Sequence, residues 1–346
     1  MNFTEILTHW YSDNKRNLPW RETKNPYNIW LSEIILQQTQ IKQGLPYYEA
    51  FVNHFPTVFD LANASEEQVL KLWQGLGYYS RARNLHSAAK FIASECNGIF
   101  PSTYSEIIKL KGVGDYTASA IASICFDEPT AVVDGNVYRV LSRYFGLDTP
   151  INSTKGIKEF KAIASTLIDH ERPGDYNQAI MEFGAMQCKP KNPYCIVCPL
   201  KDSCKALQNG LVEKLPVKLK KTKITKKHIN FLVLISSDKQ TIFEKRTSKG
   251  IWRNLYQFPL IESETPLQTE NFRSHKEVVN YFNGSTFEFS LYNTTDVIHK
   301  LSHQHLHTRF WIIEIDQLPK AGMPITSLQS FPAPVLISNF IEEFGF

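Results

Sequence analysis

The sequence Leu110-Lys-Gly-Val-Gly-Asp-Tyr-Thr-Ala118 joins two helical segments through a turn that contains Gly112 and Gly114. Glycine lets the backbone approach a ligand closely. The N–H groups that begin the second helix have no partners within the helix, so they suit an anion such as a phosphate. A plain tight turn between helices often has the same glycines, and this segment alone leaves both interpretations open.

Around this turn, residues 1–210 are predicted to be helical, because apolar residues recur at three- and four-residue spacing. Short Gly/Pro breaks separate the helical segments. These segments are Ile29–Ile41, Glu66–Trp73, Arg81–Ala93, Tyr116–Ser123 and Ile157–Leu167.

The pattern changes after residue 229, where β-branched and aromatic runs bounded by turn residues predict strands. These runs are Phe231–Ile235, Thr241–Phe243, Phe287–Leu291 and Arg309–Ile315, with helices predicted at Ser274–Phe282 and Leu336–Phe344. Residues 211–228 are predicted to be a linker, and residues 214–228 hold seven lysines and no acidic residue. This linker either is simply solvated or also follows phosphates.

Composition narrows the class of protein. The 346 residues are 42% hydrophobic with a net charge of +4, which excludes whole-chain disorder and favours two or more domains. No apolar run approaches the ~20 residues of a membrane span. The N-terminus lacks a basic patch followed by an apolar run, so we expect no targeting signal and a cytoplasmic, nucleoid-associated protein. In that reducing environment, a disulfide framework is not expected.

Four cysteines, Cys188, Cys195, Cys198 and Cys204, have the spacing C-x6-C-x2-C-x5-C. Four thiolates within 17 residues can surround one soft metal centre. Zinc and an iron–sulfur cluster both accept four thiolates, and spacing alone does not choose between them.

Two carboxylates are candidates for acid–base chemistry. Glu33 lies in an otherwise apolar helical segment, where lost hydration raises a carboxyl pKa and favours a general acid; the alternative is an exposed glutamate on a polar face. Asp134 precedes a helix, as an ordinary N-cap does, and the helix N-terminus would also keep it ionised beside a cation. One acid and one carboxylate are what cleavage of a glycosidic bond requires.

The turn at 110–118, followed by the four cysteines, resembles the endonuclease III-like helix–hairpin–helix superfamily. Further segments are similar to the A/G-specific adenine DNA glycosylase family (MutY-type). They are Leu18–Arg21, Pro26–Tyr27, Trp30–Gln40, Gly75–Asn84, Asp134–Val137 and Asn177–Ala185. The resemblance implies a monofunctional enzyme that hydrolyses the bond to adenine mispaired with 8-oxoguanine or guanine in double-stranded DNA. It also implies that the cysteines hold a 4Fe–4S cluster.

The resemblance assigns roles to individual residues. Glu33 would protonate the flipped adenine at N7, Asp134 would stabilise the sugar, and Tyr116 and Asn136 would position these groups. The predicted DNA and base contacts are Arg16, Trp20, Arg21, Gln38, Thr39, Tyr78, Gly112, Gly114 and Glu182. Tyr116 stands where bifunctional relatives have a lysine, and only an amine forms a Schiff base, so little strand cleavage is expected.

The segment Trp252–Pro259 resembles the Nudix-like 8-oxoguanine recognition domain of the same family. Glu262, Glu264, Glu270 and Glu277 do not form the glutamate helix of a Nudix hydrolase, so we expect the fold without the pyrophosphatase activity. Leu301, Ser302 and His303 match the family's Phe-Ser-His loop, with Leu in the first place. Residues 299–307 hold four histidines, and their alternation without a nearby acid favours a structural role over a metal site.

The predicted architecture is therefore multidomain: an all-α helix–hairpin–helix glycosylase domain with an iron–sulfur cluster loop, and an α+β Nudix-like C-terminal domain. Residues 1–27 and 135–210 would form one helical lobe, residues 28–134 the second, and residues 229–346 the recognition domain. We expect a monomer without membrane association. One competing hypothesis is a bifunctional glycosylase/lyase for oxidised pyrimidines, and Tyr116 argues against it. The other is a non-catalytic lesion binder, and the presence of both acids argues against it.

Overall fold

The computed structural model describes residues 2–219 and 224–346 and divides into two compact units. One unit comprises Met1–Ala64 and Ser80–Lys220, and the other comprises Ser65–Tyr79 and Lys221–Phe346. Three lysines of the predicted linker, at positions 220, 221 and 223, lie outside the described residues. Within the described ranges, no helix is both long and apolar enough to cross a bilayer.

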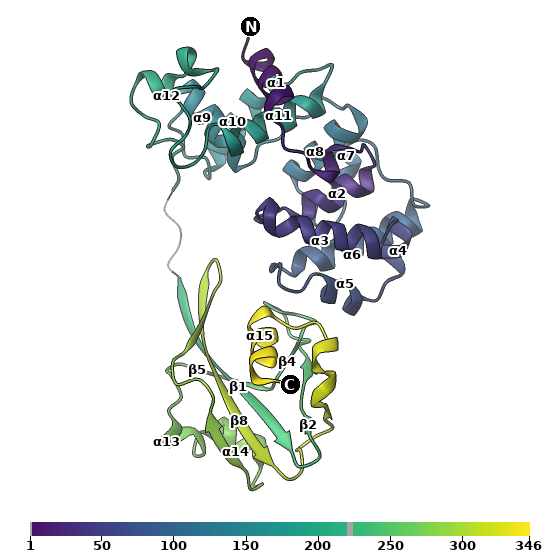
Figure 1. The fold of residues 1–346 in the computed structure, drawn as a ribbon, viewed down its shortest axis with the longest axis vertical. Helices are drawn as coiled ribbons and strands as arrows, with labels where there is room; N and C mark the ends of the chain where they lie inside the picture. Colours follow the sequence, from purple (N-terminus) through teal and green to yellow (C-terminus); the bar gives the residue numbers. More distant parts are fainter. Residues whose placement is uncertain (1, 220–223) are drawn as a thin grey trace. The chain divides into compact units, whose positions relative to one another are not determined.

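The first unit is helical, as predicted (Figure 1). Its helices are α1 (Phe3–Asn14), α2 (Pro26–Ile35), α3 (Ile41–His54), α4 (Val58–Asn63), α6 (Ser80–Glu95), α7 (Tyr104–Ile107), α8 (Asp115–Phe126), α9 (Gly135–Phe145), α10 (Thr154–Leu167), α11 (Pro173–Met186) and α12 (Lys205–Gln208), with a 3-10 turn at Pro19–Arg21.

The predicted helix Ile29–Ile41 is wrong at its end, because α2 ends at Ile35 and α3 begins at Ile41. Leu36 caps α2, and Gln38 takes a left-handed backbone with φ of 55°. The apolar periodicity continues across this turn, so the sequence pattern did not reveal the break. The turn exposes Gln38 between the two helices.

The predicted hairpin is α7, a tight turn and α8. Gly112 has φ of +83°, and a Cβ atom there would lie 2.6 Å from Asn84 Cβ, so a side chain would be both strained and crowded. Gly114 is the N-cap of α8 in an ordinary extended conformation. The turn therefore requires glycine at position 112, because of the backbone conformation there. At position 114, an added Cβ atom would meet no other atom within 4 Å.

Helices distant in the sequence pack side by side. Figure 1 shows the N-terminal α1 beside α11, in agreement with their contacts. Helices α9 and α11 approach so closely at Gly184 that a Cβ there would lie 2.9 Å from the backbone oxygen of Asn136. This close packing brings the first turn of α9, which follows Asp134, against α11.

The second unit contains the α+β fold predicted from the sequence. Its strands are β1 (Thr225–Ser236), β2 (Gln240–Thr241), β3 (Glu244–Lys245), β4 (Tyr256–Gln257), β5 (Leu260–Ser263), β6 (Glu288–Leu291), β7 (Val297–Lys300), β8 (Gln304–Ile315) and β9 (Met323–Pro324); its helices are α5 (Glu66–Leu72), α13 (Thr269–Phe272), α14 (Lys276–Phe282) and α15 (Val335–Phe344), with a 3-10 segment at Ile325–Ser330.

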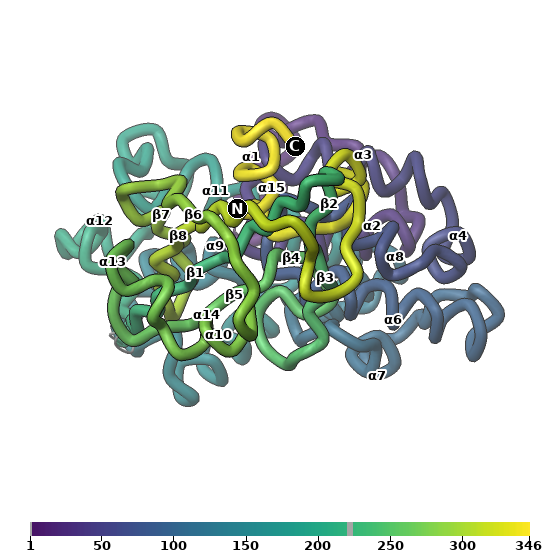
Figure 2. Tube along the Cα trace, turned by 90° about the horizontal axis from the view of Figure 1, so that it is seen from below, coloured from purple at the N-terminus to yellow at the C-terminus, as the bar shows by residue number. Residues whose placement is uncertain are grey.

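The main sheet has the order β5-β1-β8-β6, and β7 also pairs with β8; Figure 2 shows β6, β7 and β8 close together. The long β1 and β8 are parallel over their whole length. β1 starts at Thr225, so residues 225–228 of the predicted linker are strand, because they pair with β8. The predicted strand Thr241–Phe243 is wrong beyond Thr241.

Helices cover both faces of this sheet. On one face, Phe272 of α13 stacks on Trp311 at 4.1 Å between ring centroids, within a core that includes Leu232 and Leu234. On the other face, Phe340 of α15 stacks on Phe310 at 4.1 Å. Burial of both faces explains why β1 is apolar at successive positions rather than alternating.

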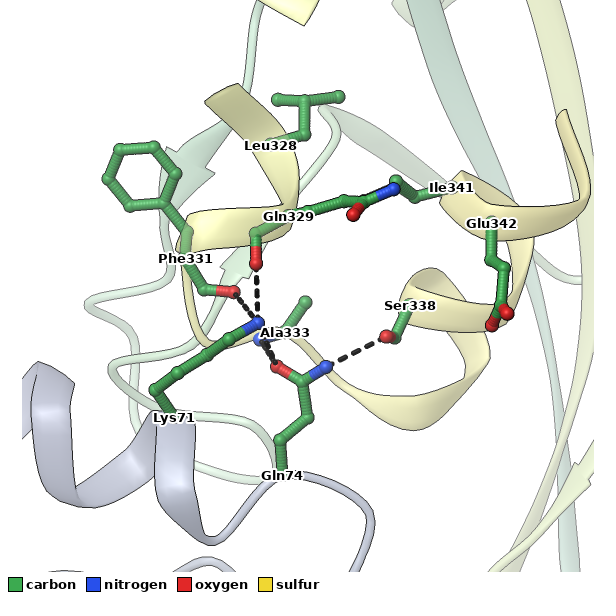
Figure 3. Close-up of a pocket in the computed structure, with 9 residues that line it drawn as sticks. All are labelled: Lys71, Gln74, Leu328, Gln329, Phe331, Ala333, Ser338, Ile341 and Glu342. Atoms are coloured by element: carbon green, nitrogen blue, oxygen red, sulfur yellow. Dashed lines mark hydrogen bonds between the residues drawn. The ribbon is translucent and has the colours of Figure 1, made fainter. Parts of the chain in front are cut away.

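The α5 segment, residues 65–79, belongs to this same unit (Figure 3). Gln74 donates to Ser338 Oγ at 2.7 Å and accepts from the Ala333 N–H at 3.1 Å. Glu67 accepts from Lys245 Nζ at 3.0 Å and from the Tyr256 hydroxyl at 2.8 Å. The prediction of a single lobe over residues 28–134 did not foresee that this segment packs with the C-terminal residues.

Candidate active site

Asp134 is the N-cap of α9. Its Oδ1 accepts from the backbone N–H groups of Asn136 and Val137, each at 2.8 Å, and its Oδ2 accepts from Asn136 Nδ2 at 2.8 Å. The capping role and a functional role are therefore compatible, since three donors fix the orientation of one carboxylate. Burial nonetheless outweighs these hydrogen bonds and raises the pKa of Asp134, contrary to the expected effect of the helix N-terminus.

A buried arginine extends this arrangement. Arg139 Nη2 donates to Asn136 Oδ1 at 2.8 Å and to the Gly184 carbonyl at 2.6 Å. Its Nε donates to the Cys188 carbonyl at 2.7 Å. A continuous set of hydrogen bonds thus runs from the cysteine loop through Arg139 and Asn136 to Asp134. Arg139 stands one turn after Asn136 in the same helix, and no pattern in the sequence predicted its role.

Glu33 lies on α2, which packs against α8, the helix that carries Tyr116. Tyr116 and Asp134 both act on the pKa of the Glu33 carboxyl group. The pKa of Glu33 is raised to about 7, chiefly by burial. A Tyr116 hydrogen bond and Arg21 oppose this increase, and the Asp134 charge adds to it. The Tyr116 hydroxyl also lies 3.3 Å from Met181 Sδ. Burial and both carboxylates raise the pKa of Tyr116 well above its usual value, so this hydroxyl stays a donor.

A third carboxylate, that of Glu182 on α11, has a different environment. It is 1% exposed and receives Arg16 through Nε at 2.8 Å and Nη2 at 2.6 Å. Arg21 adds two contacts, at 3.0 and 2.8 Å. Burial alone would raise the pKa of Glu182, but the two guanidinium groups lower it to about 2. The neighbouring Trp20 is 7% exposed and packs edge-on against Tyr48.

The turn that carries Gln38 and Thr39 is held by another buried arginine. Arg81 donates through Nη1 to the carbonyls of Ile34 at 3.1 Å and Ile35 at 3.0 Å, and reaches the Gln37 carbonyl as well. Its Nη1 is also 3.5 Å from Thr39 Oγ1. Arg81 therefore fixes the end of α2, close after Glu33, although sequence reasoning gave it no role.

The remaining predicted DNA contacts belong to the other unit. Tyr78 is 49% exposed with a left-handed φ of 48°, and the adjacent Tyr79 hydroxyl donates to the Ala333 carbonyl at 3.2 Å. Leu301, Ser302 and His303 form the loop between β7 and β8, closed by a 2.9 Å hydrogen bond from Leu301 N to the Gln304 carbonyl. Ser302 and His303 are exposed.

The four cysteines line a common cavity beside α9. Arg143 lies there too, with Nη1 3.4 Å from Cys188 Sγ and 2.8 Å from the Lys189 carbonyl. A tetrahedral zinc site with Zn–S bonds of about 2.3 Å would bring the sulfurs to about 3.8 Å of one another. Among the described residues, no three of these sulfurs lie within 4.8 Å of one another. Four thiols around one cavity are a donor set that zinc and an iron–sulfur cluster both accept, and the sulfurs would have to move closer together to hold a single zinc ion.

The glutamates that follow Pro259 are distributed over several elements. Glu262 is on β5, where it pairs with Lys227 Nζ at 2.9 Å, whereas Glu270 is on α13 and Glu277 is on α14. These elements are separate and short, so they do not form one glutamate-bearing helix.

Comparisons with known proteins agree with this architecture. Residues 31–164 match the model of the HhH-GPD superfamily of base excision DNA repair proteins, and residues 230–343 match that of the NUDIX domain. Among solved structures, a thermostable thymine-DNA glycosylase shares 28% identity at a TM-score of 0.56, covering 60% of this chain and 95% of its own. A trapped endonuclease III–DNA covalent intermediate, 22% identical at a TM-score of 0.53, covers 60% and 95% and shows the same fold.

Similarity to curated proteins extends over most of the chain. Adenine DNA glycosylase of Buchnera aphidicola subsp. Baizongia pistaciae is 37% identical over 317 residues, which is 90% of this chain and 86% of the relative. The human adenine DNA glycosylase is 44% identical over 222 residues, 62% of this chain and 41% of its own length.

Proposed function

The chain belongs to the adenine DNA glycosylase family, and we propose that its substrate is adenine paired with 8-oxoguanine, or with guanine, in duplex DNA. It is a base-excision-repair enzyme that binds DNA and hydrolyses the N-glycosidic bond of adenine. The observation that carries the proposed mechanism is the pairing of a carboxyl whose pKa is about 7, Glu33, with the hydrogen-bonded carboxylate of Asp134.

In this mechanism, Glu33 donates its proton to N7 of the extruded adenine, so the base leaves as a neutral molecule. The C1′–N9 bond breaks and the sugar becomes an oxocarbenium-like cation. Asp134, oriented by Asn136 and two backbone N–H groups, stabilises that cation. Water then adds to C1′ and gives its proton to Glu33, which restores the starting state.

The enzyme is proposed to be monofunctional. Tyr116 and Tyr138 carry hydroxyl groups, which cannot form an imine with the sugar. Lys161 does approach this region, but its Nζ already donates to Asp115, Ser119 and the Ala131 carbonyl at 2.7–3.1 Å. Borohydride should therefore trap no stoichiometric covalent complex with substrate DNA, and a trapped complex would contradict the proposal.

The four cysteines are proposed to hold a 4Fe–4S cluster. The protein is proposed to act as a monomer. When bound, the cluster would fix the loop against α9, where Arg139 and Arg143 already contact residues 188 and 189. Brown protein with broad absorbance near 400 nm and about four irons per chain would support this assignment. A colourless protein that contains one zinc would contradict it.

The central experiment measures free adenine released from duplexes that carry 8-oxoguanine:A or G:A, before and after alkali. We expect release before alkali and strand breaks only after alkali. The exposed loop at 301–303 is proposed to sense 8-oxoguanine, so His303→Ala should reduce the preference for 8-oxoguanine:A over G:A. His305→Ala, two residues along β8, is the matched control, and equal losses on both substrates in His303→Ala would oppose a sensing role.

A further inference from the structure

A second cluster of metal-ligand residues lies in the C-terminal unit, apart from the four cysteines. His228 on β1, His307 on β8 and Asp296 before β7 each offer one ligand atom, and these three atoms all lie within 4.8 Å of one another. All three side chains are partly buried rather than freely solvated.

The sheet topology assembles this cluster from distant parts of the sequence. β1 and β8 run parallel with His228 directly opposite His307, and their ring centroids are 5.1 Å apart. Asp296 precedes Val297, whose partner on β8 is Thr308, so the carboxylate reaches His307 Nδ1 at 3.4 Å. The sequence analysis saw alternating histidines without a nearby acid; the structure supplies that acid, together with a second histidine from β1.

We propose that His228, Asp296 and His307 form a binding site for a divalent cation of the zinc type. Two imidazoles and one carboxylate are a ligand set that zinc accepts, with a water molecule in the fourth position. A bound ion needs ligand atoms about 2.0–2.2 Å from the metal, so small side-chain rotations must close the present spacing.

Arg309 both supports and weakens this site. Its Nε donates to Asp296 Oδ1 at 2.7 Å, and its Nη1 donates to the Leu267 carbonyl at 2.7 Å. Oδ1 is thus held in place, which leaves Oδ2 directed toward His307 as the ligand atom. The guanidinium also repels a dication, so the affinity is lower than in a site without a nearby cation.

A bound ion would join three segments at one point of the domain: β1, β8 and the turn into β7. Because β7 and β8 are the two arms of the hairpin that ends in the 301–303 loop, the ion would stiffen the base of that hairpin. An effect of zinc on the discrimination of 8-oxoguanine:A from G:A would depend on the proposed function of the 301–303 loop. The binding of zinc does not depend on that function.

The test uses the full-length protein with its cysteine site loaded with iron. It is incubated with zinc sulfate and desalted, and the zinc retained per chain is measured by atomic emission. Wild type and His305→Ala should each hold about one more zinc than His228→Ala, His307→Ala or Asp296→Asn. His305 is a matched control because it is a histidine on the same strand, opposite Lys226. Equal zinc in wild type and His307→Ala, or a loss in His305→Ala as well, would overturn the proposal.

A second measurement covers the case in which one variant folds poorly. Zinc should raise the unfolding temperature of wild type and His305→Ala but not of Asp296→Asn, because a ligand that binds only the folded state stabilises it. An equal zinc-dependent rise in Asp296→Asn would contradict the site. Adenine release by the wild type, assayed separately, reports on the proposed function and does not depend on this outcome.

Discussion

Glu33 and Glu182 are glutamates of the same helical unit with opposite electrostatic environments. The pKa of Glu33 is raised to about 7, whereas that of Glu182 is lowered to about 2. Burial raises the pKa of both side chains, so burial does not cause the difference. Glu182 receives two bidentate arginines and a backbone N–H at 3.0 Å, whereas Glu33 faces one tyrosine hydroxyl and a second carboxylate.

The comparison shows that the donors around a buried carboxylate decide its charge state. Glu182 is ionised at neutral pH and its oxygens accept hydrogen bonds from Arg16 and Arg21, which suits a role in holding these two predicted DNA contacts in place. Glu33 exchanges a proton near neutral pH, which suits a general acid. Both residues are glutamates, so the difference between their pKa values comes from the residues around them.

Glu33→Gln should have the largest effect on catalysis. The amide keeps the shape of the side chain but has no proton to donate to adenine, so the single-turnover rate should fall by at least ~10²–10⁴. Duplex binding, measured by anisotropy, should remain, because the mutation removes no DNA-facing positive charge. Adenine release at the wild-type rate would remove Glu33 from the mechanism, and loss of binding with unchanged helicity would favour a DNA contact instead.

Glu182→Gln tests the other carboxylate. It leaves Arg16 and Arg21 without a counter-charge, and breaking a buried ion pair costs about 3–5 kcal/mol. We expect the lower end of that range, because the Arg16 side chain is 34% exposed and water can solvate it. Urea unfolding under anaerobic conditions measures the change, with Glu49→Gln at an exposed position of α3 as the matched control. An unchanged midpoint would show that the pair contributes no net stability.

The two acids of the candidate site could be predicted from the sequence, whereas the environment of Glu182 could not. The apolar surroundings of Glu33 and the position of Asp134 before a helix are local features, and the structure has both. Arg139, Arg81 and Asp296 were not recognised, because each acts through partners that only the fold brings near. Arg139 meets Cys188 across 49 positions, and Asp296 meets His228 through a parallel strand pair. The end of α2 at Ile35 was missed because apolar periodicity continued through the turn.

Asn136→Ala tests the hydrogen bonds that orient Asp134. The substitution removes the 2.8 Å hydrogen bond to Asp134 Oδ2 and the link to Arg139, while the two backbone donors to Oδ1 remain. A hydrogen bond to a charged group contributes about 1.5–3 kcal/mol, and loss of one of three should lower the single-turnover rate about tenfold. Thr154→Ala, at the first position of α10, is the control, because Thr154 makes no hydrogen bond with Asp134, Asn136 or Arg139. A rate equal to wild type would show that the backbone donors alone orient Asp134.

Tyr116→Phe should change the pH dependence of the rate by a modest amount. Only protonated Glu33 donates a proton, so the rate should be highest below pH 7 and fall as pH rises through about 7, the pKa of Glu33 in the folded protein. Burial sets that raised value, and the Tyr116 hydrogen bond partly opposes it by stabilising the ionised form. Tyr116→Phe removes the donor, so the pKa of Glu33 should rise and the descending limb should move to higher pH. The plateau rate should fall as well, because the hydroxyl is also predicted to position the reacting groups. The pH of half-maximal rate is therefore the quantity to compare. A limb that stays at the wild-type pH would mean that the hydroxyl does not act on Glu33, and a limb that persists in Glu33→Gln would assign the titration to another group.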